Sequence, residues 1–465
     1  MSVYYQDDLI TLYRANALNL PLADDSVDLV VTSPPYFGLR SYQDGGEHYE
    51  GQIGAEATPA EFVDALIAAT REMVRVVKPS GSIWVNLGDK YAGSFGSSPQ
   101  SGFVKDGSNK KYDGAQHTKV TRRDAIPTKS LMGIPWRYAL RCIDDLGLIL
   151  RAEVVWSKPN GLPESVTDRV RRSHEQWFHF TLNPRYYSAV DEVREAHAHG
   201  GHGSTKAERL AAGQQVRGLM NNGAMGSDNR MEGNPLGKLP GSVWTIPTEP
   251  LRVPDHLGID HFAAFPTEWP RRIITGWSPR GVCVECGEGR RPVRDGAYHF
   301  AEPGHEVDRA ALASAKAAGL TAEFVASRYG TKVKAGANHS DGQANVHPQV
   351  KRLALDFGIS QLAARNAISN AKRGLGGESC DCPEPTAPTT PGVVLDPFSG
   401  TGTTALVASV LGRHGIGVDM SADYCRLAAW RTTDPKQRAR AARKPWTPPA
   451  EQLPGQEALD FGGVQ

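Results

Sequence analysis

Cysteines and long apolar runs are both scarce in this sequence. Six cysteines in 465 residues are too few for a disulfide scaffold, which favours a reducing compartment. Residues 1–8 contain neither a basic start nor an apolar run, which argues against a signal peptide. No stretch reaches the roughly 18 apolar residues that a membrane-spanning helix needs. We therefore expect a cytoplasmic protein without a membrane partner.

An excess of charge of either sign is also missing. Lys and Arg together number 52, and Asp and Glu together number 51, so the net charge identifies no partner. If the chain binds nucleic acid, its basic residues must be concentrated locally. The length of 465 residues predicts two or three domains, or one domain with large insertions.

Apolar patterns present in the chain alternate between two periods. Residues 27–32, 82–87 and 149–156 are typical of strands, and residues 59–77 and 135–146 are typical of helices. The segment 27–32 is apolar nearly throughout, as a strand buried on both faces would be. Strands that alternate with helices predict an α/β sheet.

Three segments lack any apolar period. Residues 91–130 and 194–240 are predicted to be long flexible loops, and residues 433–465 a disordered tail that contains several prolines. Between residues 101 and 130, seven Lys and Arg occur against three Asp, a local excess of four. This stretch is either a solvated loop or a loop that becomes ordered on a phosphate backbone.

A glycine-rich loop near the C-terminus lies between a predicted strand (393–396) and a predicted helix (405–411), and a second strand (414–419) ends in Asp419. The loop has no Gly-Lys-Ser/Thr for phosphates and no third glycine for a dinucleotide. Asp396 leads into it and suits a ligand with a cationic amino group, such as S-adenosylmethionine. Asp419 is placed to bind ribose hydroxyls.

Two motifs together resemble a known family. Residues 396–404 (Asp-Pro-Phe-Ser-Gly-Thr-Gly-Thr-Thr) and 32–36 (Thr-Ser-Pro-Pro-Tyr) are similar to the loops of the beta-class DNA amino-methyltransferases, in which the catalytic half also precedes the cofactor half. The resemblance covers somewhat over a third of the chain. Its other blocks are residues 77–89, 156–161, 165–169, 173–175, 243–247 and 261–266.

This resemblance implies a Rossmann-like S-adenosylmethionine-dependent methyltransferase sheet, built from residues 1–280 and 391–432. The implied catalytic residues are Ser33, Pro34, Pro35 and Tyr36. The implied cofactor-binding residues are Asp396, Pro397, Phe398, Ser399, Gly400, Thr401, Gly402, Thr403 and Asp419, with His261, Phe265 and Pro266 over the methionine end.

The chemistry of an exocyclic amine explains the types of residue in the first motif. Such an amine is a poor nucleophile because its lone pair is conjugated into the ring. Hydrogen bonds from the amine to Ser33 Oγ and to a carbonyl of the Pro34-Pro35 segment would favour a pyramidal nitrogen. Tyr36 would stack on the extruded base, since the amine cannot be reached inside a duplex. Direct methyl transfer then needs positioning more than a strong base.

Serine rather than aspartate at position 33 favours the N4 amine of cytosine in double-stranded DNA. The same machinery would also serve adenine N6, which stays open as an alternative. The resemblance further implies a bacterial or phage protein in restriction-modification or defence evasion, with a cognate restriction endonuclease as a partner. A different alternative is a zinc-stabilised DNA-binding regulator with an inactive methyltransferase fold, against which the intact Gly400, Gly402 and Asp419 argue.

Four of the six cysteines lie at the two ends of a predicted insertion, residues 281–390. Cys283 and Cys286 form one close pair, and Cys380 and Cys382 form the other. Two thiolate pairs suit a tetrahedral Zn²⁺, which would clasp the base of the insertion. The alternatives are unrelated thiols or a redox pair. The remaining Cys142 and Cys425 do not belong to a Pro-Cys loop, and we expect both to be small buried residues.

Inside the insertion, residues 349–373 show two helical patterns separated by a glycine turn at 358–360. This arrangement resembles a helix-turn-helix. A helical hairpin that packs on the catalytic domain is the alternative. In the first case the residues facing the DNA groove would be Gln361, Arg365, Asn366 and Asn370.

Overall fold

The computed structural model describes residues 2–38, 43–44, 47–48, 52–93, 126–161, 163–196, 237–259, 264–292, 348–359, 361, 364, 378–380 and 387–446. Most of the two predicted long loops therefore lies outside the described residues, as do His261 and Cys382. Within the described ranges, no helix is both long and apolar enough to span a bilayer.

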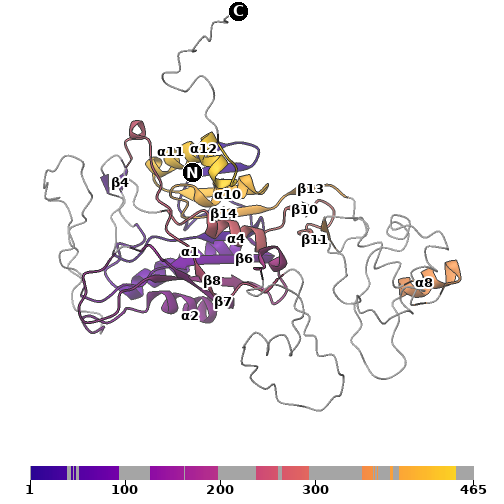
Figure 1. Cartoon of the computed structure of the whole chain (residues 1–465), viewed down its shortest axis with the longest axis horizontal. Helices are drawn as coiled ribbons and strands as arrows, with labels where there is room; N and C mark the ends of the chain where they lie inside the picture. Colours follow the sequence, from indigo (N-terminus) through magenta and orange to yellow (C-terminus); the bar gives the residue numbers. More distant parts are fainter. Residues whose placement is uncertain are drawn as a thin grey trace, which may run out of the picture.

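A nine-stranded sheet, in the order β1-β2-β15-β14-β3-β6-β8-β7-β9, organises the fold (Figure 1). Neighbours from β2 to β6 run parallel, whereas β8 is antiparallel to both β6 and β7. The strands are β1 (Ser2–Gln6), β2 (Ile10–Arg14), β3 (Val27–Thr32), β6 (Val77–Leu87), β7 (Ile149–Ser157), β8 (His174–Thr181), β9 (Val243–Thr245), β14 (Val393–Asp396) and β15 (His414–Asp419). The predicted α/β sheet is thus confirmed.

Helices cover both faces of the sheet. The helices α1 (Pro59–Val76) and α2 (Ile134–Leu146) pack on one face, and α4 (Glu268–Trp277) and α10 (Thr403–Val410) pack on the other. The central strand β3 contributes to both cores, because Val30 faces α1 while Leu29 and Val31 face α4 and α10. This double burial explains why residues 27–32 are almost continuously apolar.

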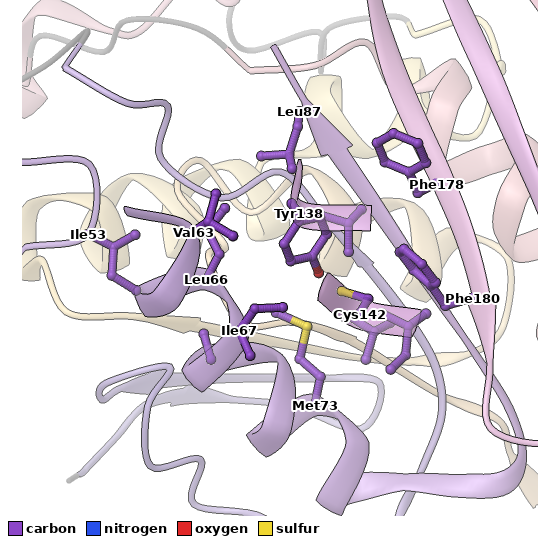
Figure 2. Packing of buried hydrophobic residues seen from close by; sticks show 14 of the residues in the cluster. Ile53, Val63, Leu66, Ile67, Met73, Leu87, Tyr138, Cys142, Phe178 and Phe180 are labelled. Carbon is purple, nitrogen blue, oxygen red and sulfur yellow. The ribbon is translucent and has the colours of Figure 1, made fainter. Parts of the chain in front are cut away.

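The core beneath α1 and α2 is shown in Figure 2. The helix α1 begins at a capping box in which Thr58 and Glu61 satisfy each other's backbone amides. Its apolar residues, among them Leu66 and Met73, meet Tyr138 of α2 and Phe180 of β8 in a single buried cluster. Cys142 lies in the same cluster, and Cys425 is buried elsewhere, so the prediction of two small buried cysteines is confirmed.

The C-terminal segment needs a correction. Residues 433–465 were expected to be a disordered tail, but α11 (Ala422–Thr433) is followed by a further helix, α12 (Pro435–Ala441). Asp434 caps α12 through Gln437 N, at 2.8 Å, and Pro435 occupies the first turn, where proline is tolerated. Ala441 is buried against the cluster that contains α4 and α10. The prediction is therefore wrong at 435–441, while residues 447–465 lie outside the description.

Strand β8 carries a buried histidine in the middle of the sheet. The His179 ring stacks on Trp84 with centroids 4.4 Å apart, and its Nε2 lies 3.1 Å from Ser82 Oγ. Burial disfavours the charged imidazolium and lowers the pKa of His179 to about 3. The ring is therefore neutral in the folded protein at neutral pH.

Acidification should destabilise the fold through His179. The unfolded chain takes up a proton near pH 6.5, while the folded chain resists protonation down to about pH 3, so stability is lost as pH falls through that window. A His179→Phe variant retains a ring to stack on Trp84 but removes this titration. Urea midpoints between pH 7.5 and 4.5 should fall more steeply for the wild type than for the variant. Parallel curves would contradict the assignment.

Candidate active site

Two loops meet at the carboxyl edge of the sheet, between β14 and β3. From β14 the chain crosses through α10 to β15 on one side, and from β3 it crosses through α1 to β6 on the other. Such a reversal of direction opens a crevice beyond the strand ends, where ligands bind in open α/β sheets. The predicted glycine loop leaves β14 and the predicted catalytic loop leaves β3, so both enter this crevice.

Asp396 ties the two loops together. Its Oδ1 accepts a hydrogen bond of 2.6 Å from Thr32 Oγ1 and one of 3.1 Å from Phe398 N, and its Oδ2 accepts one of 2.8 Å from Thr404 Oγ1. The residue is only 1% exposed, and burial raises the pKa of its carboxyl to about 6. At neutral pH the carboxylate is thus ionised, and three donors compensate for its burial.

These contacts give Asp396 a different role from the one that the sequence suggested. Sequence reasoning made it a direct ligand of a cationic amino group, because it precedes the glycine loop. Its carboxylate instead faces Thr32 and Thr404 inside the protein and presents almost no surface to the crevice. The contacts of Asp396 are those of a residue that fixes the position of both loops.

Asp419 has the exposure that Asp396 lacks. It ends β15 partly exposed, and its Oδ2 accepts 2.9 Å from Gly400 N while Oδ1 accepts 2.9 Å from Ser421 N. Gly400 adopts a φ of +47°, and a Cβ built on it would meet only Phe398 O, at 4.0 Å. The backbone of the loop is therefore open on that side.

Glycines also let the loop lie close to β15 and to α11. A Cβ on Gly417 would lie 2.4 Å from Ser399 Oγ, and one on Gly402 would lie 2.9 Å from Ala428 Cβ. Ser399 Oγ is itself buried, with no hydrogen-bond partner among the described residues. The close packing that a third loop glycine gives in dinucleotide-binding folds is thus achieved here by a glycine on the following strand.

Sequence reasoning missed Arg431 of α11, which supports the loop from behind. Its Nη1 donates to Thr401 Oγ1 and to Thr403 Oγ1, at 2.6 Å each. The side chain is buried, which lowers its pKa to about 10 and leaves it charged at neutral pH. The only sequence signal was that Arg431 directly follows four apolar residues, 427–430.

In the predicted catalytic loop, Ser33 and Tyr36 converge on Asn86 of β6. Ser33 Oγ donates to Asn86 Oδ1 at 3.2 Å, and the Tyr36 hydroxyl lies 2.8 Å from the same oxygen. Asn86 Nδ2 donates to Gln176 O at 3.0 Å, which fixes the orientation of the amide. A lone asparagine in the strand Ser-Ile-Trp-Val-Asn-Leu signals this role, although sequence reasoning did not assign one.

The Tyr36 hydroxyl also lies beside a second acceptor, and its single proton can be donated to only one of the two. It lies 2.8 Å from Glu175 Oε2, and Glu175 Oε1 accepts 2.5 Å from Lys158 Nζ. Lys158 in turn sits 4.0 Å from the centre of the Trp156 ring. Glu175 and Lys158 both lie within the sequence blocks that resemble the family, but neither was predicted as a site residue.

The remaining predicted site residues have mixed positions. Pro34 and Pro397 are buried and Pro35 and Phe398 half-buried within their loops. Phe265 packs edge-on against the Trp177 ring, 5.7 Å between centroids, and Pro266 is buried beside it. No described contact joins Phe265 to the glycine loop, so its predicted place over the cofactor stays a prediction.

Three of the four predicted zinc ligands come together. The Sγ atoms of Cys283, Cys286 and Cys380 lie within 4.8 Å of one another. Backbone amides of Cys286 and Glu285 point at the Cys283 sulfur and lower the pKa of that thiol to about 6. The fourth predicted ligand, Cys382, lies outside the described residues.

Short strands close the base of the insertion around these sulfurs. Strand β10 (Gly281–Cys283) pairs with β13 (Thr389–Pro391), and β11 (Arg291–Pro292) pairs with β12 (Glu378–Ser379). The two ends of the insertion are thus adjacent, as a clasp requires.

The predicted helix-turn-helix is described only in part. The helix α8 (Pro348–Phe357) and a left-handed Gly358, with φ +62°, match its first half. Gln361 is helical and exposed, whereas Arg365, Asn366 and Asn370 lie outside the described residues. Figure 1 draws α8 away from the central sheet. A role in reading DNA stays a prediction.

Known proteins resemble parts of the chain. M.XycI, a type II methyltransferase of Xanthomonas campestris pv. cyanopsidis, is 40% identical over 193 residues, which are 41% of this chain and 60% of that protein. M.Cfr9I, a type II methyltransferase of Citrobacter freundii, is 32% identical over 276 residues, or 59% of this chain and 74% of that protein. The first match thus spans less than two thirds of its relative.

A solved structure titled PvuII DNA methyltransferase (cytosine-N4-specific) aligns with 95% of this chain and 94% of its own, at 15% identity and a TM-score of 0.45, which is too low to support a conclusion. The model of a protein family described as DNA methylase matches residues 27–284 and 387–429, well over half of the chain and including both loops. The chain therefore belongs to this family, the S-adenosylmethionine-dependent DNA amino-methyltransferases of the N4/N6 type.

Proposed function

We propose that the chain methylates the exocyclic N4 amine of cytosine in double-stranded DNA. The observation that carries the proposal is the hydrogen bond of 2.6 Å between Thr32 and Asp396, which holds the Ser-Pro-Pro-Tyr loop beside the glycine loop. An amine acceptor and a nucleotide-binding loop thereby share one crevice. Proximity of this kind is what a direct transfer between two bound molecules requires.

The residues of the glycine loop fit S-adenosylmethionine. The open backbone at Gly400 leaves room for a ligand, and the unpartnered Ser399 Oγ offers a buried polar atom. Asp419 would accept hydrogen bonds from ribose hydroxyls, and the charge of Arg431 behind the loop would favour a ligand carboxylate. When bound, this cofactor supplies a methyl group on a sulfonium, which needs no metal and no covalent enzyme intermediate.

The contacts of Ser33 suit it to accept a proton of the target amine. Its own hydroxyl proton is directed to Asn86 Oδ1, so the oxygen lone pairs are left for the amine. Because Asn86 Nδ2 is bound to Gln176 O, the amide cannot reverse and offer a donor to Ser33 instead. A second acceptor from the Pro34-Pro35 backbone would complete the pyramidal geometry at nitrogen.

Serine at position 33 is the basis for choosing cytosine N4 over adenine N6. We further propose a setting in restriction-modification, which agrees with the relatives named as type II methyltransferases. The partner would be a cognate endonuclease that recognises the same DNA.

The product and two substitutions test this function. DNA from an expressing host, digested to nucleosides and analysed by mass spectrometry, should contain N4-methylcytosine.

Tyr36→Ala should slow methylation up to roughly a hundredfold, because stacking on an aromatic ring contributes ~1–3 kcal/mol. Ser33→Ala should slow methyl transfer with little change in DNA affinity. N6-methyladenine alone would overturn the choice of base, and full activity of both variants would overturn the mechanism.

A pair of aspartate substitutions tests the cofactor site. Asp419→Ala should weaken S-adenosylmethionine binding roughly ten- to a hundredfold, since a hydrogen bond to a charged group contributes ~1.5–3 kcal/mol. Asp396→Ala should also weaken S-adenosylmethionine binding. It should lower the free energy of unfolding as well, because Thr32 and Thr404 lose their buried partner. Calorimetric titration and urea unfolding separate the two effects. Unchanged affinity in both variants would remove the site from residues 396–419.

We also propose a structural Zn²⁺ at the cluster of Cys283, Cys286 and Cys380. Zn–S bonds of 2.3 Å in a tetrahedron bring sulfurs to about 3.8 Å, which agrees with three sulfurs within 4.8 Å. Gly287, with φ +69°, turns the chain after Cys286, and its N–H donates 2.9 Å to Cys283 O. The sequence supplies Cys382 as the fourth thiolate. The metal would join the two ends of the insertion.

Elemental analysis tests the metal. Freshly purified protein, never exposed to chelator, should contain about one zinc per chain. Cys283→Ser should lower this content sharply, whereas Cys425→Ala, at a buried cysteine outside the cluster, should leave it unchanged. Chelation should increase proteolysis within residues 293–377 and leave S-adenosylmethionine binding intact. Protein that is active and free of metal would refute the site.

A further inference from the structure

The side chain of Tyr36 is held from three directions. Its hydroxyl contacts Asn86 of β6 and Glu175 of β8, each at 2.8 Å. Its ring lies against Gly88, where an added Cβ would come within 2.7 Å of Tyr36 Cε2. Glycine at position 88 therefore leaves the space that the ring occupies.

Glu175 is itself oriented by a cation. Lys158 Nζ lies 2.5 Å from Glu175 Oε1, which leaves Oε2 directed at the Tyr36 hydroxyl. The Lys158 and Glu175 side chains are only 19% and 15% exposed, so solvent screens their attraction less than at the surface. The Trp156 ring, 4.0 Å from Nζ, limits where the ammonium can move.

These contacts exclude a simple proton relay. A proton leaving the target amine through Ser33 would next meet Asn86 Oδ1, and an amide carbonyl does not take up a proton at neutral pH and pass it on. Glu175 therefore has no route to the amine through the hydrogen bonds described. Its connection to the reaction runs through the position of Tyr36.

We propose that Glu175, oriented by Lys158, is a positioning residue that sets the plane of the Tyr36 ring for the extruded base. The inference rests on the proposed function, because it assumes that Tyr36 stacks on the target. Asn86 Oδ1 of β6 lies 2.8 Å from the same hydroxyl, so the antiparallel pair β6–β8 borders it on two sides. The single phenolic proton is donated to the carboxylate of Glu175, the stronger acceptor of the two, which explains a tyrosine here rather than a phenylalanine.

A double-substitution cycle tests the proposal. Single-turnover methylation of unmethylated plasmid DNA with tritiated S-adenosylmethionine is compared for the wild type, Glu175→Gln, Tyr36→Phe and the double variant. Glu175→Gln should slow the step roughly ten- to a hundredfold, the size of a lost hydrogen bond to a charged group. In the Tyr36→Phe background the same substitution should have almost no further effect on the rate, because the hydroxyl that contacts Glu175 is already absent.

Two further readouts separate positioning from a structural role. S-adenosylmethionine affinity and the urea midpoint of Glu175→Gln should stay close to the wild type. Asp64→Asn removes the charge from an exposed ion pair with Arg141 between α1 and α2, and as a matched control it should leave the rate unchanged. A loss of rate that follows the loss of stability would overturn the proposal.

The failure of this inference and that of the proposed function are distinguishable. A wild-type protein that methylates no DNA would refute the proposed function. An active wild type in which Glu175→Gln and Tyr36→Phe slow the reaction additively would refute the positioning role alone, since Glu175 would then act independently of the tyrosine hydroxyl.

Discussion

The buried hydrogen bond between Thr32 and Asp396 is the interaction on which the site depends. It joins residues 364 positions apart and lies at the point where the sheet reverses its winding. Because Asp396 is shielded from water, its charge is compensated only by the donors the fold supplies. Loss of any one donor would leave a buried charge undercompensated, so the loop after β3 and the loop after β14 are held to one relative position.

The sheet brings a second set of distant residues to the same edge. Strand β8 lies between β6 and β7, so its Glu175 reaches Tyr36 next to Asn86 of β6, while Lys158, which follows β7, approaches Glu175 from the other side. Apolar packing below keeps these strands in register, with Trp84 and His179 stacked 4.4 Å apart. Polar contacts at the edge are therefore placed by a rigid aromatic core rather than by the loops alone.

The base of the insertion is held together by other interactions than the sheet. Its described base consists of two short ladders and three sulfurs, with a small buried cluster of Cys283, Cys380 and Ala387. The described base therefore buries little apolar surface, which is the situation in which small modules use a metal. The candidate active site shares none of these residues.

The sequence by itself determined the positions of the two loops of the candidate site, the cysteine pairs and most helices and strands of the sheet. These follow from local signals: the period of apolar residues, glycines and prolines in turns, and short motifs. Local signals also gave a wrong prediction where they were weak. The prolines at 445–454 suggested a disordered tail, and the short, capped helix α12 was therefore missed.

Only the tertiary structure decided which residues meet. That Asp396 faces inward, and that Asn86, Glu175 and Lys158 gather at Tyr36, depends on strand order and on pairings between distant segments. A local pattern shows that residue 396 ends a strand. It does not show which residues from distant segments pack over its side chain. The physical reason is that burial and hydrogen-bond partners arise from the packing of the whole sheet, whereas propensity and period act over a few residues.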